Sequence, residues 1–132
     1  MSSVVSAQTL PLTKHHGLGN DFLVLLDVDG GHRGLDLARL AERVCDRRLG
    51  VGADGLLVAT AGHEGADVTM VLHNADGGRA EMSGNGIRCF AQAVWDAGVA
   101  TTGHELRVAT DAGTRIVRRI SRARSTKARS FT

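Results

Sequence analysis

The chain has 132 residues, 42% of them hydrophobic, which fits one compact domain. Its two cysteines are too few for a disulfide framework. Its formal charge of +2 comes from the end of the chain, because six Lys and Arg residues lie after position 117 and the first 117 residues carry a net charge of −4. With one Trp, three Phe and no Tyr, the chain offers few side chains that stack on bases, so we expect no nucleic-acid partner.

Residues 1–13 are expected to form a flexible leader. Residues 22–28 (FLVLLDV) then form an apolar run that ends in a glycine-rich turn, which predicts a buried strand. The next apolar residues recur at the spacing of one helical face, and Asp36 stands where an N-cap belongs. These residues are Leu37, Leu40, Ala41, Val44 and Cys45. Cys45 is therefore expected in the core.

Residues 56–60 and 68–74 predict two short strands, and a turn at residues 76–78 leads toward residues 79–82. We expect these strands to be antiparallel. A second helix is predicted from Gly84, because an apolar face recurs every three to four residues and Gly98 stands at a C-terminal cap position.

Residues 104–110 and 114–120 predict a β-hairpin, since a short DAG-containing turn joins two strand-like segments. The predicted fold class is α+β, with a mainly antiparallel sheet curled around a central helix.

Three common functional motifs are not supported. Gly50, Gly52 and Gly55 match G-x-G-x-x-G, but they follow a predicted helix and precede a strand, the reverse of the order that dinucleotide binding requires. Ser83 lacks the upstream glycine of a hydrolase nucleophile elbow, where Glu81 stands instead. The six histidines lack zinc-ligand spacing, so we expect no metal site.

The segment Gly84-Asn85-Gly86 is a candidate anion site. It lies at the first turn of a predicted helix, where backbone N–H groups and the helix dipole favour a negative group, and the glycines permit close approach. A carboxylate is the natural ligand. Ser83, just before this turn, is either a helix N-cap or a catalytic group, although a hydroxyl does not ionise at neutral pH without a neighbouring base.

Four motifs, in this order and spacing, make the chain similar to the N-terminal half of the diaminopimelate epimerase family. They are KHHGLGNDF (residues 14–22), GVGADGL (50–56), NADG (74–77) and AEMSGNGIRCF (80–90). The resemblance implies a cofactor-independent, two-base epimerase that interconverts LL- and meso-diaminopimelate for lysine and peptidoglycan precursor synthesis. It also implies two lobes, each with a sheet around a central helix. Each lobe supplies one thiol, and the two thiols act on opposite faces of the substrate.

The resemblance assigns site residues position by position. Asn20 and Asn74 match substrate-binding asparagines, and Gly84, Asn85 and Gly86 match the segment that holds the substrate's α-carboxylate. Ser83 stands at the position of the first catalytic cysteine. Cys89 is not expected to replace that thiol, because it lies further along the helix and out of phase with Ser83.

Two departures from the family pattern concern the site directly. Many members carry a substrate-contacting glutamine where this chain has Gly55. The second lobe, which would complete the site in cis or in trans, is not in these 132 residues, and the apolar surface it would cover favours association, including a homodimer.

Two alternatives remain open. One is a non-catalytic carboxylate-binding lobe, or an inactive fragment, of the same family, which the serine at position 83 favours. The other is a phenazine-biosynthesis-type isomerase, which uses a carboxylate as its base, with Glu81 as the candidate.

The domain division that follows places an epimerase-like lobe at residues 14–117 and a basic, Ser-rich tail at residues 118–132. No signal-peptide pattern and no membrane-length apolar run occurs, so we expect a cytoplasmic protein without a membrane partner.

Overall fold

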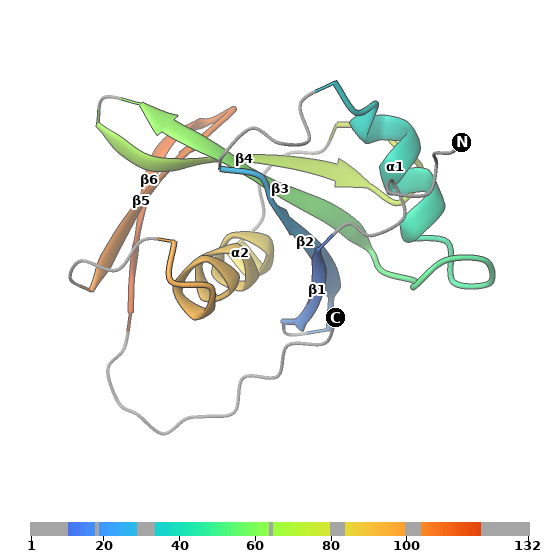
Figure 1. Cartoon of the computed structure of the whole chain (residues 1–132). Coiled ribbons are helices and arrows are strands. Elements are labelled where there is room, and N and C mark those ends of the chain that lie inside the picture. The colour runs from blue at the N-terminus through green and yellow to red at the C-terminus, as the bar shows by residue number, and fades with distance from the viewer. Residues whose placement is uncertain are drawn as a thin grey trace.

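The computed structural model describes residues 11–17, 19–28, 34–63, 65–79, 84–99 and 104–119. These contain a six-stranded sheet and two helices (Figure 1). The strands are β1 (Leu12–His16), β2 (Asp21–Leu26), β3 (Gly55–His63), β4 (Ala66–Asn74), β5 (Glu105–Thr110) and β6 (Gly113–Arg118), and the helices are α1 (Leu37–Val44) and α2 (Gly84–Asp96). Neither helix in these ranges is long and apolar enough to cross a bilayer.

The strands lie in the sheet in the same order as in the chain. The pairs β1–β2, β3–β4 and β5–β6 are antiparallel, whereas β2–β3 and β4–β5 are parallel. The expected antiparallel pairing of the strands at residues 56–60 and 68–74 is confirmed by β3 and β4. The strand predicted at residues 22–28, in contrast, runs parallel to its neighbour β3. The reason is that α1 connects β2 to β3, and a helical crossover returns the chain to the same end of the sheet.

Each helix covers one face of the curved sheet, and α2 lies in its concave side (Figure 1). Successive strand residues point to opposite faces, so Leu56 packs in the cluster with α1 while its neighbour Leu57 packs in the cluster with α2. Phe90 of α2 is fully buried against the sheet. This arrangement explains the continuous apolar run in β2, a strand buried on both faces.

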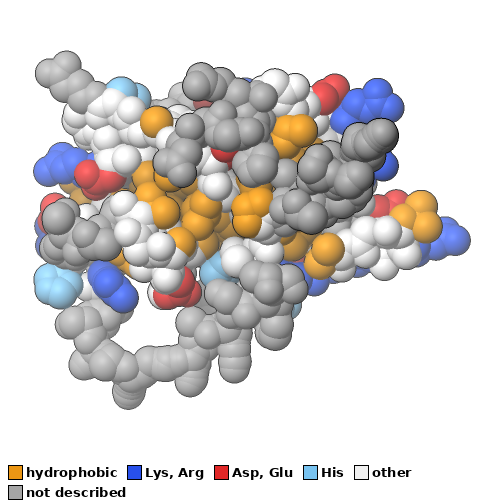
Figure 2. Space-filling view, in the orientation of Figure 1, with side chains coloured by type: hydrophobic (Ala, Val, Ile, Leu, Met, Phe, Trp, Pro, Cys, Tyr) orange, Lys and Arg blue, Asp and Glu red, His pale blue; other side chains and the backbone are white. Residues whose placement is uncertain are grey.

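The hydrophobic cluster that includes α2 is the larger of the two core clusters among the described residues. Figure 2 shows hydrophobic side chains gathered across the middle of this view, with charged side chains mainly toward its margins. The partly buried residues packed against this cluster are Leu26, Val28, Trp95, Val99 and Val117. The predicted α+β fold with a sheet curled around one helix is confirmed.

Several local predictions are also confirmed. Asp36 caps α1, because its side chain accepts a hydrogen bond from the Arg39 N–H, and Cys45 is buried at the end of that helix. Gly98 follows α2 with a φ of 74°, the left-handed conformation of a helix C-cap. The strand β1 was not predicted, and the Ala80–Met82 part of the predicted turn lies outside the described residues.

Candidate functional site

Two aspartates cap the adjacent parallel strands β2 and β3. Asp21 is the first residue of β2 and Asp54 immediately precedes β3, where Phe22 pairs with Gly55. The Asp54 N–H donates to Oδ1 of Asp21 at 3.0 Å, and the Asp21 N–H donates to Oδ2 of Asp54 at 3.0 Å. This reciprocal pair satisfies two backbone donors and brings two carboxylates close together.

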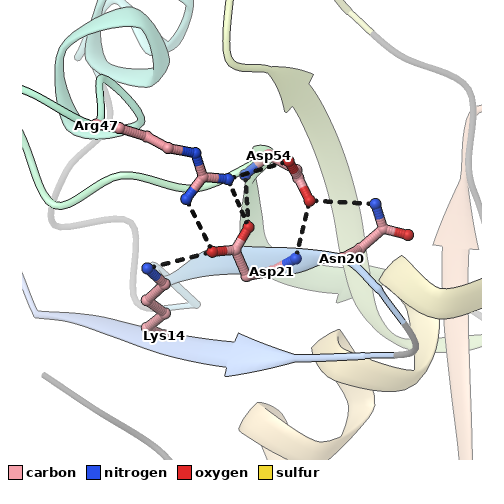
Figure 3. A network of polar contacts seen from close by, with 5 residues as sticks. All are labelled: Lys14, Asn20, Asp21, Arg47 and Asp54. Carbon is pink, nitrogen blue, oxygen red and sulfur yellow. Dashed lines mark hydrogen bonds and ion pairs between the residues drawn. The ribbon is translucent and has the colours of Figure 1, made fainter.

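Two cations compensate these carboxylates (Figure 3). Arg47 donates to both oxygens of Asp21, at 3.2 and 2.9 Å, and also to Oδ1 of Asp54 at 3.1 Å. Nζ of Lys14 lies 3.2 Å from Oδ2 of Asp21. The Arg47 hydrogen bond holds the pKa of Asp21 well below its usual range, partial burial opposes this, and the Lys14 contact lowers the pKa further.

A chain of side-chain amides extends from this network to α2. Nδ2 of Asn20 donates to Oδ2 of Asp54 at 3.1 Å, and Nδ2 of Asn85 donates to Oδ1 of Asn20 at 3.1 Å. Gly17 allows this approach, because a Cβ there would lie 3.3 Å from Cβ of Asn85 and 3.4 Å from Sγ of Cys89. The loop between β1 and β2 therefore packs directly on the first turn of α2.

Asn74 lies at the same end of the sheet, at the end of β4. It is paired with Gly55 in the β3–β4 register. The turn after it is closed by a bond from the Gly77 N–H to the Asn74 carbonyl at 2.8 Å, and Nδ1 of the buried His73 lies 3.0 Å from the Gly77 carbonyl. The turn is joined to the aspartate pair by a 3.2 Å bond from the Ala75 N–H to the Asp54 carbonyl.

An open, mostly polar cavity of about 410 Å³ lies over this network. Its lining residues are His16, Gly17, Gly19, Asn20, Asp21, Arg47 and Asp54. Its wall thus offers the neutral amide of Asn20, the imidazole of His16, and two carboxylates that are ion-paired with the Arg47 guanidinium. Such a surface suits a polar ligand that carries both charges.

The structure brings some of the expected site residues together. Asn20 and Asn85 are hydrogen-bonded, and Asn74 lies in a turn that Asp54 joins to them. Gly84 is exposed as the first residue of α2, and Gly86, two residues later, is buried. Ser83 and Glu81, the candidate catalytic residues, lie outside the described residues.

The charged members of the network were not predicted. Asp21 and Asp54 stand inside the quoted motifs GLGNDF and GVGADG, but no role was given to them. A signal was present, since each aspartate directly precedes or begins an apolar strand-forming run. Arg47 had no such signal, because it lies 26 residues from Asp21 in the chain.

Neither cysteine is a ready base. Burial raises the pKa of the Cys89 thiol to about 11. The pKa of the Cys45 thiol is also raised to about 11, and burial is the largest cause. Both side chains are therefore protonated at neutral pH. The expectation that Cys89 does not replace a catalytic thiol agrees with its burial beside Gly17.

No group of three or more His, Cys, Asp or Glu side chains in the described ranges is placed to hold a metal ion.

Solved structures define the class of fold to which this lobe belongs. Methylitaconate-delta-isomerase is similar with a TM-score of 0.65 and 12% identity, over 85% of this chain and 35% of that one. A phenazine biosynthesis protein of the PhzF family from Bacillus anthracis gives a TM-score of 0.61 and 22% identity, over 81% of this chain and 35% of that one. The chain thus has the fold of one lobe of these larger proteins.

Sequence comparison then gives the family. The profile of the diaminopimelate epimerase family matches residues 12–125. A diaminopimelate epimerase from Caldanaerobacter subterraneus is 50% identical over 101 residues, covering 76% of this chain and 35% of the relative. One from Microcystis aeruginosa is 45% identical over 111 residues, covering 83% and 39%. This chain belongs to the diaminopimelate epimerase family, and it spans about a third of the length of these relatives.

Proposed function

We propose that this chain is the N-terminal lobe of a diaminopimelate epimerase and forms one half of its substrate site. The complete site would interconvert LL- and meso-2,6-diaminopimelate by two-base proton transfer without a cofactor, in the cytoplasmic synthesis of lysine and peptidoglycan precursors. The observation that carries the proposal is the Asn20–Asn85 hydrogen bond. It joins two family motifs that lie 65 residues apart at the edge of a polar cavity.

The described residues suit binding of the amino-acid substrate. Asn20 and Asn85 are neutral amides that can donate to a carboxylate and accept from an ammonium group. Gly84 places the exposed start of α2 beside them, where backbone N–H groups favour an anion. The nearby aspartates are already paired with Arg47 and Lys14, so they add little net charge to the cavity.

Proton transfer needs more than this lobe. Ser83 directly precedes α2 in the sequence, and a serine hydroxyl is a poor base at neutral pH unless a neighbouring group activates it. A second lobe, in cis or in trans, would supply a thiol and exclude water, which strengthens stabilisation of the carbanion-like transition state. In this mechanism Ser83 relays a proton through water while the opposite thiol acts as the base.

The test is α-hydrogen exchange followed by NMR. The chain is incubated in heavy water with LL- and, separately, meso-diaminopimelate, with and without the separately expressed C-terminal lobe of a diaminopimelate epimerase. We expect exchange only when the lobe is added, and at strongly unequal rates for the two stereoisomers. No exchange in either case, from a folded chain, would remove the catalytic proposal; equal rates would remove the role of Ser83.

The serine at position 83 favours one other function, a non-catalytic carboxylate-binding lobe of the same family. This alternative predicts diaminopimelate binding without α-hydrogen exchange in the same samples. A phenazine-type isomerase rests on fold similarity alone, and its candidate base Glu81 lies outside the described residues. Exchange with diaminopimelate would exclude both.

A further inference from the structure

Asp54 forms hydrogen bonds with Asn20, with the turn after Asn74 and with Asp21. Its Oδ2 accepts from Asn20, its carbonyl accepts from the Ala75 N–H in the turn after Asn74, and its N–H donates to Asp21. We propose that Asp54 is a positioning residue for substrate binding: its carboxylate fixes the orientation of the Asn20 amide and, through it, that of Asn85. This inference rests on the proposed function, because it assigns a role to groups around the same substrate site.

The orientation follows from the chemistry of the groups. An ionised carboxylate only accepts hydrogen bonds, so the side of the Asn20 amide that faces Asp54 must be Nδ2. Oδ1 of Asn20 is then turned toward Asn85, which must present its own Nδ2 as the donor. Without Asp54, either face of the Asn20 amide could turn toward Asn85, and the pattern offered to a ligand would be mixed.

Asp54 is itself held by several bonds and does not depend on burial. Its side chain is 41% exposed, which makes a single hydrogen bond weak and easily exchanged with water. However, Oδ2 also accepts from the Asp21 N–H, and Oδ1 accepts from Arg47, so both carboxylate oxygens are engaged (Figure 3). Rotation of the carboxylate would break bonds at both oxygens together.

The substitution Asp54→Asn tests this role because it keeps the shape and changes one acceptor into a donor. If the oxygen of the introduced amide faces Asn20 and Asp21, its NH₂ group faces the Arg47 guanidinium, which is also a donor. If the amide is reversed, its NH₂ group faces the donors of Asn20 and Asp21. Neither orientation satisfies the whole network, so the two compete, and the Asn20 amide no longer has one favoured direction.

The experiment uses the full chain, ¹⁵N-labelled, and records the side-chain amide signals. The sequence contains only three asparagines, Asn20, Asn74 and Asn85, so these signals can be assigned individually. We expect Asp54→Asn to shift the Asn20 and Asn85 side-chain signals and to speed their hydrogen exchange. We also expect it to weaken meso-diaminopimelate binding, measured by titration, about tenfold, the loss of one hydrogen bond to a charged group.

The matched control is Asp67→Asn. Asp67 is also an exposed carboxylate that accepts a backbone N–H, from Arg107 at 2.9 Å, but it lies near the start of β4, at the opposite end of that strand from Asn74. It should change neither the three asparagine signals nor the titration. Unchanged Asn20 and Asn85 signals in Asp54→Asn would overturn the positioning role.

A measurement on the unsubstituted chain keeps the inference testable if Asp54→Asn does not fold. Nδ2 of Asn20 and the Asp21 N–H donate to the same oxygen, so their protons should give a nuclear Overhauser effect. Its absence would refute the fixed orientation. If the unsubstituted chain shows the effect but does not respond to diaminopimelate, the proposed substrate fails while the orientation by Asp54 stands.

Discussion

Replacement of Gly55 tests whether the site can accept a side chain where many family members have glutamine. Gly55 is buried between β2 and β4, and a Cβ there would lie 2.9 Å from the His73 carbonyl oxygen and 3.2 Å from Cδ1 of Leu72. The nearest atom belongs to the backbone of a central strand, so relief requires movement of β4. Asn74, the partner of Gly55, would move with it.

The expected cost of Gly55→Ala is the difference between two effects. Overpacking of a filled core costs about 1–3 kcal/mol, and the smaller entropy of an unfolded chain with Ala returns about 0.4–1 kcal/mol. Because the closest atom is backbone, the overpacking cost should lie in the upper part of that range. We therefore expect the free energy of unfolding to fall by about 1–2 kcal/mol, and the melting temperature by at least about 4 °C for a domain of this size. Gly55→Gln should destabilise the chain more and should not restore a substrate contact.

The assay is urea unfolding followed by the fluorescence of Trp95, the single tryptophan, which packs against the α2 core. The matched control is Gly84→Ala at the start of α2, where no described atom lies within 4 Å of the added Cβ, and its midpoint should stay equal or rise. A Gly55→Ala midpoint at or above that of the unsubstituted chain would refute the close packing of β3 on β4.

Three further predictions concern the titratable and catalytic groups. Because the pKa of Asp21 is depressed in the folded chain, mainly by Arg47, stability should be full above about pH 4, the unfolded value, and fall as the pH drops below it. Arg47→Ala should flatten this fall in acid-unfolding curves and Arg48→Ala should not; equal curves would exclude the ion pair as the cause. Cys45 and Cys89 should react with a thiol reagent at pH 8 only after unfolding, and reaction of the native chain would contradict their burial and raised pKa. Ser83→Cys, combined with a C-terminal lobe, should increase α-hydrogen exchange, because a thiol at a helix N-terminus ionises far more readily than a hydroxyl; no gain would show that geometry as well as the functional group has changed.

The two helices were predictable because the spacing of their own apolar residues indicates a helical face. The helical spacing from Leu37 to Cys45 placed α1, and the apolar residues after Gly84 placed α2. The parallel pairing of β2 with β3 was not predictable in the same way, because alternation along a strand says which face is buried and nothing about the direction of its neighbour. Only the α1 connection between the two strands carried that information.

The site residues, like the strands, were only partly predictable from the sequence. The family motifs identified Asn20 and Asn85 as site residues, but their mutual hydrogen bond spans 65 positions and depends on how the β1–β2 loop packs against α2. The ion pairs of Arg47 likewise depend on the fold, because Arg47 and Asp54 lie between α1 and β3 whereas Asp21 begins β2. Charged residues in polar loops are ordinarily solvated, so only the fold shows that these three form a network.

The strands lie in the sheet in the order in which they are synthesised, and this order affects how the sheet can form. Every strand from β2 onward can pair with the strand synthesised just before it, with a hairpin or one helix between them. Among the six described strands, each neighbouring pair is already joined, so a further strand could add only beside β1 or β6. Such local connectivity lowers the loop-closure cost of each step and favours stepwise growth of the sheet during synthesis.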